Sequence, residues 1–153
     1  MRIVSIRAFT VLLLASILLS IPQQARAEER VNRDRKGIAI DGYDPVAYFV
    51  DSKPVQGQPE FEYTVNGTRY LFASAANRDR FAQNPSAYIP QYGGFCAYAV
   101  SLGRTADIDP EAWSVVEGRL FLNYSKSVQK TWQQDVPGNI RKADGNWPKL
   151  REK

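Results

Sequence analysis

Alternating apolar and polar positions predict two β-hairpins in this chain. Phe61 to Val65 and Thr68 to Phe72 are runs of aromatic and β-branched residues on either side of Asn66-Gly67. Asn-Gly between such runs favours a type I′ turn, because both of its central residues need positive φ. Residues 114–123 predict a second pairing of short strands, with Gly118 in the turn between them.

Each predicted hairpin is followed by a helix signal. Ser74 is suited to cap a helix that ends near Asn84, because a serine hydroxyl accepts a hydrogen bond from a free N–H of the first turn. Ser125 stands in the same way before a helix in which Val128 and Trp132 share one face at i, i+4 spacing. Both helices are therefore expected to pack one apolar face against the core.

Other segments predict shorter elements. Residues 38–40 and 46–50 are expected to be strands around a turn at Asp44-Pro45. Asp109-Pro110-Glu111 is typical of a helix start, with an N-cap, a proline at the first helical position and an acid in the first turn. A last helix is expected over residues 137–145. Short antiparallel strands and hairpins packed with several short helices indicate a small α+β fold, and no internal repeat is visible in the sequence.

The N-terminal region is typical of a secretory signal peptide. Residues 8–21 are apolar except for three hydroxyl residues, and Ala25-Arg26-Ala27 places small residues where a signal peptidase cleaves. This apolar run is shorter than the roughly 20 residues needed to span a bilayer. We therefore expect a signal peptide at 1–27, a flexible charged segment at 28–36 and one domain at 37–150. The protein is expected to be periplasmic or secreted, with no membrane span after cleavage.

The net charge gives no indication of a nucleic-acid partner. The chain of 153 residues has a formal charge of +4, from Lys+Arg 20 and Asp+Glu 16. Three of the arginines (Arg2, Arg7 and Arg26) and none of the acids lie in the predicted signal peptide, so cleavage leaves a charge of +1. The basicity belongs to the targeting segment, and we expect no DNA or RNA ligand.

The absence of histidine excludes several kinds of site. Ser-His-Asp triads, Cys-His pairs, histidine zinc sites and histidine haem ligation all need a residue type that this sequence lacks. The one cysteine, Cys96, excludes an intrachain disulfide and four-thiolate metal sites. An enzyme built on this chain would have to use carboxylates, lysine, tyrosine or that thiol.

Residues 37–150 resemble the YHS domain family in its exported single-domain form. The resemblance is carried by Tyr70-x-Phe72-x-Ser74 with Phe81, Pro85 and Tyr88 after it, by the block Gly42 to Phe49, and by the block Pro90 to Ala97. It implies the fold of that family over nearly the whole chain after the signal peptide.

The resemblance also implies where a metal site would lie. Relatives attached to copper-transporting ATPases are thought to hold metal through four cysteines, and these positions fall on Asp44, Ala47, Ala73 and Asn77. None of the four is a cysteine here, and the histidine of the family name is missing as well. The fold is therefore expected to be shared with these relatives, and the cysteine metal site is not.

The blocks that carry the resemblance also supply the candidate ligand-binding residues, which are Tyr43, Asp44, Tyr92, Cys96 and Tyr98. Cys96 is also the candidate metal ligand, and no catalytic residue is assigned. Three roles are open for Cys96: a buried small apolar residue, a reactive or metal-binding thiolate, or one half of an intermolecular disulfide.

Three functions are compatible with these features. The first is an exported binding or accessory module for an unknown small ligand or protein partner, with no cofactor assigned. The second is a periplasmic metal-handling protein, for copper, centred on Cys96. The third is a small enzyme that uses carboxylates or the single thiol. The first is the interpretation we prefer.

Overall fold

The computed structural model describes residues 29–152, so the predicted signal peptide at 1–27 and the predicted new N-terminal residue, Glu28, lie outside the described residues. The described chain folds into short helices and two separate two-stranded antiparallel sheets, which confirms the α+β class. Within the described part of the chain, no helix is long and apolar enough to cross a membrane.

Both predicted hairpins are present. Their strands are β1 (Gln58–Val65) with β2 (Thr68–Phe72), and β3 (Asp109–Val116) with β4 (Arg119–Asn123). Asn66 and Gly67 have φ values of 47° and 73°, and Glu117 and Gly118 have 50° and 72°. These positive φ values confirm the turn geometry expected from Asn66-Gly67, and the second turn repeats it.

A helix follows each hairpin as predicted, and three further helices lie elsewhere in the described chain. The helices are α1 (Ala47–Val50), α2 (Ala75–Gln83), α3 (Ala97–Ser101), α4 (Lys126–Gln133) and α5 (Val136–Leu150), with 3-10 turns η1 (Ile40–Gly42), η2 (Pro85–Ala87) and η3 (Tyr92–Gly94). Ser74 Oγ accepts from Asn77 N at 3.1 Å and caps α2, and Ser125 Oγ accepts from Val128 N at 3.3 Å and caps α4. Trp132 of α4 is fully buried.

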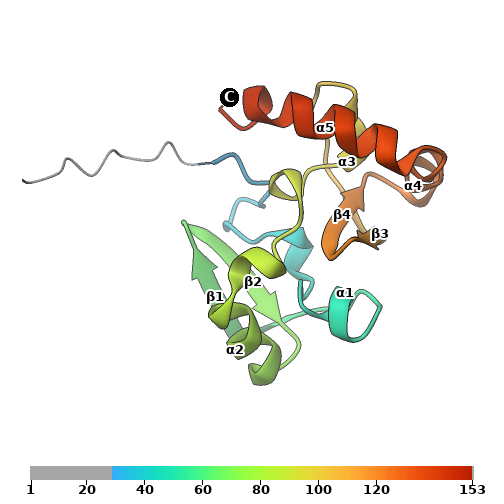
Figure 1. Ribbon diagram of the computed structural model, residues 1–153. Helices are drawn as coiled ribbons and strands as arrows, with labels where there is room; N and C mark the ends of the chain where they lie inside the picture. Colours follow the sequence, from blue (N-terminus) through green and yellow to red (C-terminus); the bar gives the residue numbers. More distant parts are fainter. Residues whose placement is uncertain (1–28, 153) are drawn as a thin grey trace, which may run out of the picture.

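The structure contains an internal repeat that is not visible in the sequence. Each unit has a 3-10 turn in which all three residues have positive φ, then a short helix, a hairpin and a serine-capped helix. We call residues 40–83 the first unit and residues 92–133 the second unit. The strand registers shift at the same place in both, between Gln58 and Glu62 and between Asp109 and Trp113. Figure 1 shows the two hairpins as separate parts of the molecule, each with its own helix.

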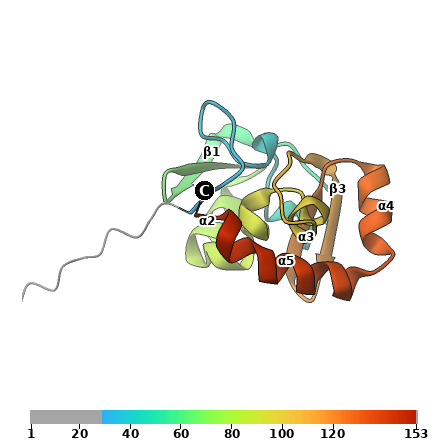
Figure 2. The same cartoon turned by 90° about the horizontal axis from the view of Figure 1, so that it is seen from above.

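The two units share one core through strand β4, which is buried on both faces. Leu120 and Leu122 belong to a cluster with Phe72 and Phe81 of the first unit, whereas Phe121 belongs to a second cluster with Trp132. Successive side chains of a strand point to opposite faces, so β4 contributes to both clusters. Helix α5 lies along the second unit, as Figure 2 shows from above, and buries Ala143 and Leu150 in the second cluster.

Two predicted strands and one predicted helix are wrong. Ile38 and Ala39 form only isolated β-bridges, to Arg69 and Arg33, residues 40–42 form η1, and residues 47–50 form α1 in place of strands. The reason is that Asp44 Oδ1 accepts from Val46 N at 2.8 Å and from Ala47 N at 3.3 Å, which starts a helix. Asp109 instead begins β3, and its Oδ1 accepts from Glu111 N at 2.9 Å, a local turn that resembles an N-cap in sequence.

The two ends of the domain also extend further than predicted. Helix α5 starts at Val136 and continues past Gly145 to Leu150, because Leu150 is buried in the core. In the segment 28–36, predicted to be flexible, Arg30 N donates to Arg151 O at 3.2 Å and Asn32 N to Gly93 O at 2.8 Å. These are backbone contacts, which a charged composition does not reveal.

Candidate functional site

The four positions that carry cysteines in metal-binding relatives meet at one corner of the first unit. Asp44 is completely buried there, and its carboxylate has four donors. Besides the N–H groups of Val46 and Ala47, Asp44 Oδ2 accepts from Ala73 N at 2.9 Å and from Asn77 Nδ2 at 2.7 Å. The carboxylate thus joins the start of α1 to the junction between β2 and α2.

This corner does not fit the metal that the family implies. Ala47 and Ala73 have no side-chain donor atom, and both oxygens of Asp44 already accept hydrogen bonds. Among residues 29–152, no three His, Cys, Asp or Glu side chains lie together as a metal ion would require. A hydrogen-bonded carboxylate therefore stands at the corner where relatives have thiolates.

Cys96 occupies the equivalent corner of the second unit. Its Sγ accepts from Tyr124 N at 3.3 Å, and Tyr124 precedes the cap Ser125 just as Ala73 precedes the cap Ser74. The thiol also lies 3.7 Å from Asn123 Oδ1, and Cys96 is 1% exposed. The buried position favours the first of the three roles considered for Cys96, a small buried residue.

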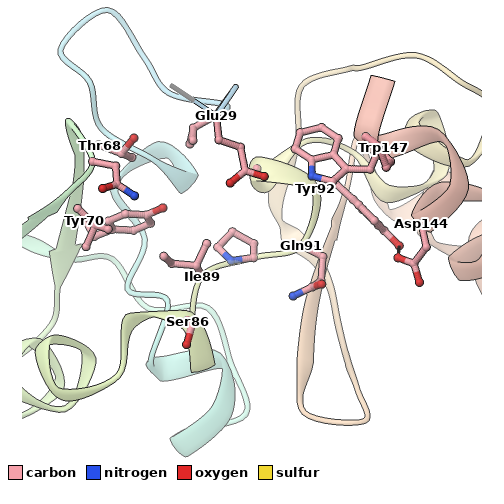
Figure 3. Close-up of a pocket in the computed structure, with 15 residues that line it drawn as sticks. Glu29, Thr68, Tyr70, Ser86, Ile89, Gln91, Tyr92, Asp144 and Trp147 are labelled. Carbon is pink, nitrogen blue, oxygen red and sulfur yellow. Dashed lines mark hydrogen bonds between the residues drawn. The ribbon is translucent and has the colours of Figure 1, made fainter. Parts of the chain in front are cut away.

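A cleft of about 420 Å³ lies between the first unit and helix α5. The first unit contributes Val65, Thr68 and Tyr70 from its hairpin, and α5 contributes Asp144 and Trp147 from the other side. The connection between the units contributes Ile89 and Pro90, the second unit contributes Tyr92, and Glu29, which precedes the first unit, completes the lining. Figure 3 shows these side chains surrounding an open space. A cleft of this size can hold a small organic molecule.

Tyr70 is the most informative residue of the cleft. Its side chain is 2% exposed, yet its hydroxyl forms no hydrogen bond with any other residue that the structure describes. In Figure 3 this hydroxyl points into the cleft. Burial, with a smaller contribution from the charge of Glu29, raises the pKa of Tyr70 to about 12. Tyr70 is therefore a neutral donor and acceptor that faces the cleft without a protein partner.

The opposite wall is held in place by its own hydrogen bonds. Tyr92 Oη donates to Asp144 Oδ1 at 2.8 Å, and Arg119 Nη2 donates to the same oxygen at 3.0 Å. Arg119 Nε donates to Gln91 Oε1 at 3.0 Å. Burial and then the bond to Asp144 raise the pKa of Tyr92 above its ordinary value. The carboxylate of Asp144 is thus already paired with Arg119 and Tyr92, and it holds this wall in place.

Residues 46–92 match the family model of the YHS domain. The resemblance expected from the sequence is confirmed for this segment, which contains α1, the first hairpin and α2 and ends where the second unit begins. A YHS domain suggests a metal-related accessory role, although the chain at hand lacks the thiols for it. No curated protein and no solved structure matches the chain.

The YHS segment supplies most of the cleft lining, including Tyr70 and Tyr92, and residues outside it, among them Glu29 and Trp147, supply the rest. Of the five candidate ligand-binding residues, the cleft includes only Tyr92. Asp44 and Cys96 lie at the two buried corners, and Tyr43 and Tyr98 pack against the core. Tyr70, Glu29 and Trp147 were not singled out from the sequence as ligand contacts. Tyr70 belongs to a family motif, but its spacing there is equally consistent with packing.

Proposed function

We propose that this protein is a binding module that holds a small organic molecule in the cleft between the first unit and helix α5. The observation that supports this most directly is the hydroxyl of Tyr70, which faces the cleft without a hydrogen-bond partner among the described residues, on a side chain that is otherwise buried. Because the buried ring holds this hydroxyl in place and its oxygen opens on the cleft, it can donate a hydrogen bond to a ligand or accept one from it. The residues that form the binding site belong to the domain at 37–150 and to the segment before it, which contributes Glu29.

The aromatic and apolar residues of the cleft are consistent with this role. Trp147 lies against Tyr92 with ring centroids 6.1 Å apart, and Ile89 and Pro90 lie beside them in the lining. Ligand sites are commonly apolar with a few placed polar groups, and here Tyr70 and Gln91 supply such groups. Copper handling centred on Cys96 has less support, because that thiol is buried and hydrogen bonded away from the cleft.

Mass spectrometry under non-denaturing conditions tests the proposal on protein isolated from its native compartment. We expect a species heavier than the bare chain, with the added mass lost on denaturation. Ser86→Trp would fill part of the cleft from an exposed lining position and should abolish the added mass. The matched control is Ser127→Trp on the exposed side of α4, which should keep it. If all three proteins carry the same added mass, the ligand is bound elsewhere and the cleft is not its site.

We also propose that the protein is exported, to the periplasm or the medium, through cleavage after Ala27. The support is the apolar run at 8–21 followed by Ala25-Arg26-Ala27. N-terminal sequencing of the working protein is expected to begin at Glu28. Recovery of a functional protein that still carries residues 8–21 would contradict export by this route.

A further inference from the structure

The charges around the cleft point to the class of molecule that it takes. Among the described residues that line the cleft, Glu29 and Asp144 are acidic and none is basic. Asp144 is already paired with Arg119 and Tyr92. Among the described residues, Glu29 forms one ion pair, with Arg151, whose Nη1 lies 3.6 Å from Glu29 Oε1. Glu29 is therefore the acid that remains available to a ligand.

The ion pair between Glu29 and Arg151 does not compete strongly with a ligand. The two side chains are 57% and 47% exposed, so solvent screens their attraction and the pair contributes little. Figure 3 shows the Glu29 carboxylate and the Tyr70 hydroxyl both directed into the cleft. A positive group placed there would meet a carboxylate and a hydroxyl oxygen, and a negative group would meet an acid with no basic lining residue to offset it.

We infer that the cleft selects a small organic cation, such as a protonated amine, over neutral and anionic molecules of the same size. Its ammonium group contacts the carboxylate of Glu29 and the hydroxyl of Tyr70, and its apolar body lies against Pro90 and the ring of Trp147. An aromatic ring near the ligand adds to cation binding, because its face is electron-rich. This inference rests on the proposed binding function and assigns a ligand class to the same cleft.

Three probes of similar shape separate charge from size: phenethylammonium, 2-phenylethanol and 3-phenylpropionate. Each is titrated into the purified protein, and amide shifts of the cleft residues are followed by NMR. We expect the cation to bind more tightly than the alcohol, and the anion to bind most weakly. Glu29→Gln should weaken the cation about threefold, the size expected for an exposed charge pair, and leave the alcohol unchanged. Tyr70→Phe should weaken both, because it removes the shared hydroxyl contact.

Matched controls keep the result specific to the cleft. Glu117→Gln changes an exposed acid in the turn of the second hairpin, and Tyr124→Phe removes the hydroxyl of a tyrosine that is 59% exposed. Both variants should bind all three probes as the parent protein does. Thermal unfolding of each variant confirms that it is folded before titration.

The outcomes distinguish the ligand class from the binding function itself. If the alcohol or the anion binds the cleft as well as the cation does, the cation preference is overturned and the binding function stands. If Glu29→Gln leaves the affinity for the cation unchanged, the assignment to Glu29 is overturned. If no probe shifts the cleft residues, the cation inference fails, and the mass measurement above decides separately whether the cleft binds any ligand.

Discussion

Replacing Asp44 by alanine should be among the most destabilising single changes in this protein. The carboxylate accepts from Val46 N, Ala47 N, Ala73 N and Asn77 Nδ2, and Asp44 is completely buried. Asp44→Ala removes the acceptor from all four donors. Val46 and Ala47 are themselves 0% exposed, so water cannot replace the carboxylate for their N–H groups.

The expected size follows from these two backbone donors. Leaving a buried donor without a partner costs about 2 kcal/mol, so the two together cost about 4 kcal/mol. The donors of Ala73 and Asn77 belong to half-buried residues and add less, because water can reach them. Since small domains are stable by roughly 5–15 kcal/mol, the variant should remain measurable by urea unfolding.

A double-mutant cycle with Asn77→Ala tests the reasoning. If Asn77 Nδ2 is a true partner, the two changes together should cost less than their sum by about 1 kcal/mol. Asp51→Ala is the matched control, because Asp51 is exposed and its side chain has no hydrogen bond within the described residues. Its cost should stay within about 0.5 kcal/mol. A loss below about 1 kcal/mol for Asp44→Ala would show that the corner is solvated and would refute the argument.

Three further predictions concern the thiol, zinc and the tyrosines. Cys96 should react with a thiol reagent far more slowly in the folded protein than in the denatured protein, and equal labelling rates would contradict its burial. Cys96→Ala should lower the free energy of unfolding by about 1 kcal/mol. After dialysis the protein should hold no stoichiometric zinc, because Ala47 and Ala73 stand where relatives have ligands; one equivalent that survives Cys96→Ser would reveal an oxygen site. Burial raises the pKa of Tyr48, of Tyr92 and of Tyr70, the last to about 12. Because these folded-state values exceed the unfolded value of about 10, their contribution to stability is present below pH ~10 and is lost as the pH rises through the folded values. Absorbance at alkaline pH should therefore show late tyrosine ionisation that coincides with unfolding, and a single early step for all tyrosines would contradict it.

Local signals in the sequence were sufficient wherever the interaction spans only a few residues. The Asn66-Gly67 turn and the caps Ser74 and Ser125 were predicted correctly, because each depends on neighbours within three residues. The family resemblance was also readable, since it rests on short blocks of residues. The internal repeat could not be predicted, because the two units share their backbone geometry and few identical residues at equivalent positions.

Asp-Pro shows most clearly what the tertiary structure decided. Asp44-Pro45 precedes helix α1 and Asp109-Pro110 begins strand β3, although both pairs carry the same local signal. Asp44 is buried and held by Ala73 and Asn77, which lie far along the chain, whereas Asp109 is paired with Asn123 of β4. The Asp-Pro pair alone therefore cannot predict whether a helix or a strand follows, because that depends on contacts with residues distant in the sequence.

The sequence by itself determined the α+β class, both hairpin turns, two capped helices and the exclusion of histidine chemistry. Only the tertiary structure brought Tyr70 of the first unit opposite Trp147 of α5, with Glu29 beside them. The alternation of residues along β2 indicates on which face of the strand Tyr70 lies. It does not indicate whether the hydroxyl of Tyr70 has a hydrogen-bond partner. That depends on packing between residues distant in the chain, because the cleft exists only where helix α5 lies opposite the first unit.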